Sequence, residues 1–227
     1  MPLLLGATIN RADLLDWEPR LPANGLMWIE PNSDGMPPSW SDPRFAYCQR
    51  HGTIPVIGMR TGGDSSKYET LWRHLSNMPN WLPKIYVTDH AEPERAYGTS
   101  PTAFIDNFRD WYLGVIQVLP AAIRAKVFAG PVLSATWTEE SGGGDYTRFD
   151  PGLAYSDFFG VELVQLVKAV ESRDQDVTRL ANELDRAPTA LSGKTIILRQ
   201  PTRGFGHGRS PGTRTPCRAR GRAPARS

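Results

Sequence analysis

Several ionisable side chains gather in one short segment of the chain, and their types suit acid–base chemistry. They follow residues 84–88, a β-branched and aromatic run that predicts a buried strand, and they are Asp89, His90, Glu92 and Glu94. A carboxyl group beside a second carboxyl group can stay protonated and donate a proton. Glu92 is the best candidate for the donor, with Glu94 two residues away as its neighbour. His90 is placed to hydrogen-bond a carboxylate or a hydroxyl group of a ligand.

Strand-like and helical segments alternate along the first 198 residues, and these elements must hold the reactive segment. Strands are predicted at 3–9, 26–30, 54–59, 84–88, 126–132, 157–161 and 194–198, and helices at 11–15, 43–50, 68–75, 102–118 and 163–184. This order is typical of a parallel sheet with crossover helices. The turn after the first predicted strand lacks the glycines of a nucleotide-binding open sheet, so a closed barrel is favoured.

The expected fold class is therefore α/β, a (β/α)8 TIM-type barrel. It is expected to be incomplete, with six to seven strands, because no eighth strand is visible in the pattern. Residues 1–198 would form the barrel, unless the native sequence is truncated after about residue 165. In such barrels the chemistry lies at the carboxyl ends of the strands, which is where the reactive segment falls.

The composition changes at residue 199. Of the last 29 residues, 17 are Arg, Gly or Pro; eight are Arg and none is acidic, which leaves 18 basic and 24 acidic side chains before residue 199. A segment with so few apolar residues cannot bury enough surface to offset the conformational entropy that it would lose on folding. Residues 199–227 are therefore predicted to be a disordered tail. The tail is either a basic segment for nucleic acid or a membrane surface, or a shifted reading frame, which we favour. The acidic body gives no reason to expect nucleic acid.

Cysteine usage and apolar runs narrow the protein class further. Cys48 and Cys217 are too far apart for a disulfide framework, and no metal-ligand spacing is present, so no metal or cofactor is expected. The N-terminus lacks the features of a signal peptide, and no apolar run is long enough for a bilayer. A cytoplasmic location is the default expectation, with virion association as the alternative and no membrane partner. Three tryptophans, together with Cys48, are expected to be core residues: Trp28, Trp72 and Trp111.

A resemblance to a known family adds to this picture. The segment Tyr-Val-Thr-Asp-His-Ala-Glu-Pro-Glu, residues 86–94, resembles the strand-four motif of retaining β/α-barrel glycoside hydrolases, and it is similar to mannanase-like barrels found in actinobacteria and their phages. Gly130-Pro131, Trp137-Thr138-Glu139 and residues 157–161 extend the resemblance over roughly residues 3–165. It implies a truncated glycoside hydrolase acting on β-linked polysaccharide or oligosaccharide, with Glu92 as general acid/base. The substrate would contact His90, Glu94, Trp137, Glu139 and Glu162.

Two positions depart from the family pattern. Ala91 stands where the family has Asn or His, which removes a side chain expected to contact the substrate. Residues 195–202, where the nucleophile would lie, contain no Asp or Glu, which leaves Glu139 and Glu162 as the plausible substitutes. Two alternatives therefore stay open: a non-catalytic carbohydrate-binding barrel, such as a phage tail-associated protein, and a product whose open sheet edges prevent stable folding.

Overall fold

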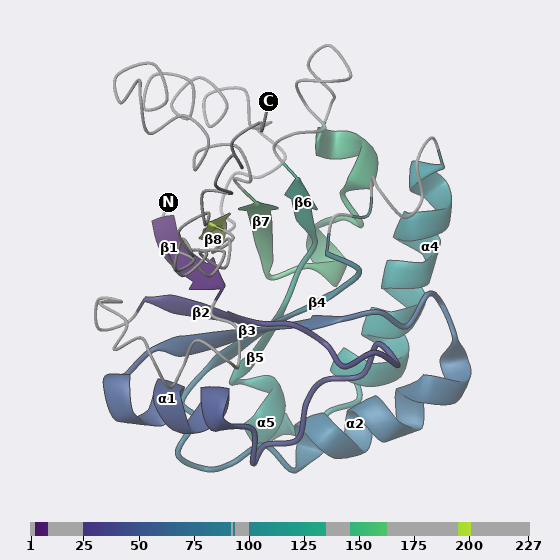
Figure 1. The fold of residues 1–227 in the computed structure, drawn as a ribbon. Helices are drawn as coiled ribbons and strands as arrows, with labels where there is room; N and C mark the ends of the chain where they lie inside the picture. Colours follow the sequence, from purple (N-terminus) through teal and green to yellow (C-terminus); the bar gives the residue numbers. More distant parts are fainter. Residues whose placement is uncertain are drawn as a thin grey trace, which may run out of the picture.

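Parallel strands joined by helices form the body of the protein in the computed structural model, which describes residues 3–8, 25–91, 93, 100–134, 146–162 and 195–200 (Figure 1). The strands are β1 (Leu3–Thr8), β2 (Leu26–Ile29), β3 (Ile54–Met59), β4 (Ile85–Asp89), β5 (Val127–Ala129), β6 (Val132–Ser134), β7 (Phe158–Glu162) and β8 (Thr195–Gln200). Their order across the sheet is β5-β4-β3-β2-β1-β8-β7-β6, and each described pairing is parallel. The predicted α/β class with a parallel sheet is confirmed.

Four α-helices connect the strands in the described part of the chain. They are α1 (Pro43–His51), α2 (Tyr68–Ser76), α4 (Pro101–Trp111) and the short α5 (Ala121–Arg124). In Figure 1, α1, α5 and α2 lie below strands β2 to β5, and α4 stands beside them at the right. Single 3₁₀ turns add Ser65–Lys67, Tyr146–Phe149 and Leu153–Tyr155.

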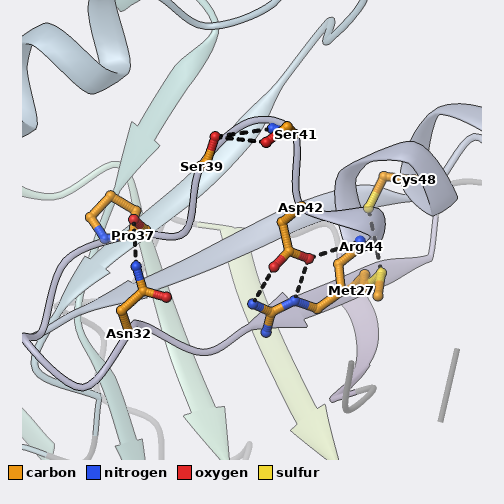
Figure 2. Close-up of polar contacts among 8 residues, drawn as sticks. All are labelled: Met27, Asn32, Pro37, Ser39, Ser41, Asp42, Arg44 and Cys48. Atoms are coloured by element: carbon orange, nitrogen blue, oxygen red, sulfur yellow. Dashed lines mark hydrogen bonds and ion pairs between the residues drawn. The ribbon is translucent and has the colours of Figure 1, made fainter. Parts of the chain in front are cut away.

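Helix α1 begins at the predicted residue and ends at His51, one residue after the predicted end. The side chain of Asp42 accepts a hydrogen bond from the backbone N of Arg44 at 3.0 Å, and it also holds the Arg44 guanidinium through Nε at 2.9 Å and Nη2 at 3.1 Å (Figure 2). Pro43 fits the first turn because its missing N–H would have no partner there. Gly52 ends the helix with φ +64°, a left-handed conformation that glycine adopts without steric cost.

Alternate residues of strands β2 to β7 belong to different clusters, so both faces of this part of the sheet are buried. On the helix-covered face, strand side chains such as Ile57, Ile85 and Val87 pack against Leu71, Phe104 and Trp111 of the helices. The opposite face carries Leu26, Trp28, Val56, Tyr86, Val132 and Phe158. Trp28 and Trp111 are buried as predicted, whereas Trp72 is partly buried at the edge of the helix-covered cluster.

The predicted single strand at 126–132 is divided in the structure. β5 pairs with β4, β6 pairs with β7, and Gly130 and Pro131 stand between them. The backbone N of Gly130 donates to the carbonyl of Val87 at 3.2 Å, and Gly160 donates to the carbonyl of Pro131 at 2.8 Å. A Cβ atom on Gly130 would lie 2.2 Å from the carbonyl oxygen of Phe158, so only glycine allows this approach.

Other sequence expectations also meet a difference. The segment 102–118 is predicted as one α-helix. In the structure α4 ends at Trp111 and a π-helical segment follows, Tyr112–Ile116, where Gly114 lies against the ring of Tyr68. Strand β8 runs two residues past the predicted barrel boundary at 198, because Arg199 and Gln200 pair with Gly6 and Ala7 of β1. The predicted helices at 11–15 and 163–184 and the tail after residue 200 lie outside the described residues. In the part of the chain that the structure describes, no helix is long and apolar enough to cross a membrane.

Cys48 gives a first testable prediction. Its thiol is buried, donates to the thioether of Met27 at 3.5 Å (Figure 2), and has its pKa raised by burial to about 11. The thiolate is the reactive form of cysteine, so the folded Cys217→Ser variant should not react with a thiol reagent such as Ellman's reagent at pH 8. After unfolding in guanidinium, the same variant should show one equivalent of reactive thiol. Rapid reaction of the folded variant would contradict the burial of Cys48.

Candidate functional site

The carboxyl ends of β3 and β4 lie side by side and bring the reactive segment to one edge of the sheet. Gly58 pairs with Thr88 and Met59 with Asp89 in parallel register. The backbone N of His90 then donates to the carbonyl of Met59 at 2.8 Å, so the pairing continues one residue beyond β4. The sequence placed the segment at a strand's carboxyl end, and the structure agrees for Asp89 and His90.

Asp89 is a buried carboxylate whose two oxygens are both used by one residue. The backbone N of Thr61 donates to Oδ1 at 2.8 Å, and the Thr61 hydroxyl donates to Oδ2 at 2.6 Å. Asp89 is 2% exposed and Thr61 3% exposed. Hydrogen bonds to a carboxylate are stronger than those between neutral groups, and little water competes at such burial. Asp89 therefore fastens the loop that follows β3 to the end of β4.

His90 stands beside this carboxylate in an unusual backbone conformation. Its φ is +54°, the one left-handed value at a non-glycine residue in the described part of the chain. Nδ1 of the ring lies 3.5 Å from Oδ1 of Asp89, and the side chain is 16% exposed. The ring also borders Gly62, where an added Cβ would lie 3.8 Å from Cε1 of His90. His90 thus lies beside a carboxylate at ion-pair distance.

The loop after β3 is tied to its surroundings on several sides. Arg60 donates its backbone N–H to the carbonyl of Gly35 at 2.9 Å, and Nζ of Lys67 donates to the carbonyl of Asp34 at 2.9 Å. Gly63, with φ +78°, lies so close to α4 that an added Cβ would be 2.5 Å from Oδ1 of Asn107. The loop after β3 therefore contacts the loop after β2, the end of β4 and α4. These contacts hold Thr61 in place beside Asp89.

The structure describes only part of the predicted site. Four of its residues lie outside the described residues: Glu92, Glu94, Trp137 and Glu139. Glu162 is the last residue of β7, where it pairs with Ser134 of β6 and with Arg199 of β8. It thus occupies the carboxyl end of a strand on the far side of β1 from His90 in the sheet order. The carboxyl end of β8 carries Arg199 and Gln200, where the family resemblance expects a nucleophilic carboxylate.

Thr61 and Gly62 belong to the site but were not predicted as site residues. In the sequence they form part of a loosely glycine-rich loop that matches no phosphate-binding fingerprint. The available signal was a hydroxyl residue two positions after one strand, with a carboxylate at the end of the next. That signal becomes specific only when the register of β3 and β4 is known.

Within the described ranges, no group of three or more His, Cys, Asp or Glu side chains is arranged to hold a metal ion. Neither a scan against models of protein families nor a search of curated proteins finds a match for this chain.

Proposed function

We propose that this chain is a glycoside hydrolase-like β/α barrel that acts on β-linked polysaccharide, with Glu92 as general acid/base. The observation that carries the proposal is the buried Thr61–Asp89 contact, with His90 beside it, at the carboxyl end of β4. Glu92 follows His90 by two residues, so this arrangement holds the chain immediately before the proposed proton donor. A β/α barrel keeps its chemistry at this end of its strands.

Barrel closure is the structural part of the proposal. β5 and β6 stand at opposite ends of the sheet order, yet only Gly130 and Pro131 separate them in the chain. Asp157, just before β7, donates its backbone N to the carbonyl of Ala129 at 2.6 Å and accepts from the N of Ala129 through Oδ2 at 2.9 Å. These contacts support β5 and β6 as one kinked strand between β4 and β7. The sheet then closes as a ring of seven strands.

Arg124 strengthens the same junction from the amino ends of the strands. Its guanidinium donates to the carboxylate of Asp157 at 3.1 and 3.2 Å, to the hydroxyl of Tyr112 at 2.7 Å and to the carbonyl of Val127 at 2.7 Å. The pKa of Arg124 is lowered by burial and raised by Asp157 and Tyr112, with a net rise. This network joins α5, β5 and the start of β7. The network supports barrel closure at the amino ends of the strands, opposite the carboxyl ends that carry the proposed site.

The proposed reaction needs two carboxyl groups on either side of the glycosidic bond. Glu92 would donate a proton to the leaving oxygen, while His90, Glu94 and Trp137 would contact the sugar. The second carboxylate would stand about 5 Å from Glu92 for retention of configuration, or ~6.5–9.5 Å for inversion. Glu139 and Glu162 are the proposed candidates for that role.

A second function, non-catalytic carbohydrate binding, is favoured by one observation. Strand β8 lies in register between β1 and β7, yet its carboxyl end carries Arg199 and Gln200 in place of Asp or Glu. A barrel that presents sugar-binding groups and lacks a nucleophile at a strand end would bind a polysaccharide without cleaving it. The partner is the same in both proposals, and turnover distinguishes them.

Glu92→Gln tests the proposed hydrolase. The amide keeps the size of the side chain and removes its proton, so turnover of a β-mannan and β-glucan panel should fall about 10²–10⁴-fold while binding is retained. Glu69→Gln is the control, because Glu69 is an exposed carboxylate on α2 that pairs with Arg73, and it should change turnover less than twofold. Turnover that survives in Glu92→Gln would remove Glu92 from the mechanism. A wild-type protein that binds the panel without cleaving it would establish the binding function, and one that does neither would reject both.

A further inference from the structure

We infer that Thr61 and Asp89 are positioning residues that together set the left-handed turn at His90 and so direct the chain toward Glu92. The inference rests on the proposed function, because Glu92 matters only if it acts on substrate. We call the pair of hydrogen bonds between Thr61 and Asp89 the clamp. Neither residue of the clamp needs to touch the substrate, because each acts through His90.

The side of β4 on which Asp89 stands argues for this role. Ile85 and Val87 belong to the helix-covered face, and strand side chains alternate, so Asp89 shares that face. Tyr86 belongs to the opposite face, which Thr88 therefore shares. The carboxylate of Asp89 is directed away from that opposite face and into the loop after β3, where Thr61 occupies both of its oxygens. A carboxylate in that position is suited to holding the backbone.

The turn at His90 is held on both sides. Asp89 is fixed by its carboxylate, and the backbone N of His90 is fixed by the carbonyl of Met59 at 2.8 Å. A φ of +54° is disfavoured for a residue with a Cβ atom, and it persists only where the surroundings determine it. The clamp and the Met59 contact provide that determination. Loss of the clamp should therefore let the chain relax at His90, two residues before Glu92.

The clamp also orders the ring of His90. Nδ1 is the ring nitrogen that lies 3.5 Å from Asp89, and the ring borders Gly62 in the loop held by Thr61. Because Nδ1 faces the Asp89 carboxylate at 3.5 Å, we expect the tautomer that carries the ring proton on Nδ1, with Nε2 as the acceptor nitrogen. The same two residues thus set the backbone and the tautomer of His90.

The loop supplies a closely matched control in Asp64. Its carboxylate accepts from the backbone N of Ser66 at 3.0 Å and from the Ser66 hydroxyl at 2.6 Å. This is the same pair of donor types that Thr61 offers to Asp89, and it lies only three residues after Thr61. Asp64 differs in being exposed, and its bonds stay within its own turn. An Asp→Asn change at the two positions therefore compares a clamp with a local cap.

The first experiment measures turnover of the β-linked polysaccharide panel by Asp89→Asn, Thr61→Val and Asp64→Asn. The amide of Asp89→Asn can accept only one of the two Thr61 bonds, so kcat should fall at least tenfold while KM changes less than threefold. Thr61→Val keeps the backbone bond and should lower kcat threefold to tenfold. Asp64→Asn should stay within twofold of wild type. If Asp89→Asn does not fold, Thr61→Val decides, and kcat equal to that of Asp64→Asn overturns the inference.

The second experiment does not depend on turnover. Nitrogen-15 NMR of the histidine rings should show the Nδ1–H tautomer of His90 in wild type and in Asp64→Asn, and loss of that preference in Asp89→Asn. If no sugar is turned over, the proposed hydrolase fails while the NMR result still tests the clamp. If turnover is present and Asp89→Asn keeps both the tautomer and kcat, the clamp is rejected and the proposed function stands.

Discussion

Gly130→Ala is expected to lower the free energy of unfolding by about 3 kcal/mol. The new methyl group would meet the carbonyl oxygen of Phe158 at 2.2 Å and Cδ1 of the Phe158 ring at 2.8 Å. A clash with backbone cannot be relieved by a rotamer change, so β5 or β7 must move. Movement would also break the contact of Ala129 with Asp157 that joins the two strands. Urea unfolding followed by circular dichroism measures the loss.

Gly52→Ala separates this clash from the ordinary cost of replacing glycine. Gly52 has φ +64° with no atom within 4 Å of an added Cβ, so the change costs only the left-handed strain, about 1 kcal/mol. The excess loss in Gly130→Ala over Gly52→Ala reports how closely the two backbones approach. Equal losses would show that residues 127–134 do not lie against β7, and barrel closure at this point would then be rejected.

The second large effect is a loss of about 3 kcal/mol of stability through His74 as the pH falls from 6.5 to 4. Burial lowers the pKa of His74 from 6.5 to about 4, because the charged ring would lose its hydration. The ring stacks on Trp40 with centroids 4.4 Å apart, and Nε1 of Trp40 donates to the carbonyl of His74 at 2.9 Å. The unfolded chain binds the proton in this window and the folded chain does not, so stability is present above pH 6.5 and is lost toward pH 4.

His74→Phe isolates this contribution from the carboxylates, which titrate in both proteins. Phenylalanine keeps a ring against Trp40 and cannot take up a proton. The difference in unfolding free energy between variant and wild type should therefore grow by about 3 kcal/mol between pH 7 and pH 4, measured by urea unfolding at several pH values. If the stabilities of His74→Phe and wild type change in parallel with pH, the pKa of His74 is not lowered by folding.

Part of the site could be predicted from sequence because its signals are local. The apolar run at 84–88, followed by ionisable residues, places Asp89 and His90 at a strand's carboxyl end without reference to any other segment. Their partners are not local. Thr61 is 28 residues away from Asp89, and the left-handed turn at His90 depends on a bond to Met59 of the neighbouring strand. The roles of Glu92 and its possible second carboxylate stay predictions, because no described contact tests them.

The sequence by itself determined the alternation of strands and helices, the parallel sheet that follows from it, and helix ends such as those at Asp42 and Gly52. These features depend on periodicity and capping within a few residues of the chain. Only the tertiary structure decided that a strand breaks at Gly130, that β8 continues to Gln200, and that Asp89 accepts two hydrogen bonds from Thr61. Each of these depends on hydrogen bonds or close contacts between segments far apart in the chain, and their register is set only when the strands assemble.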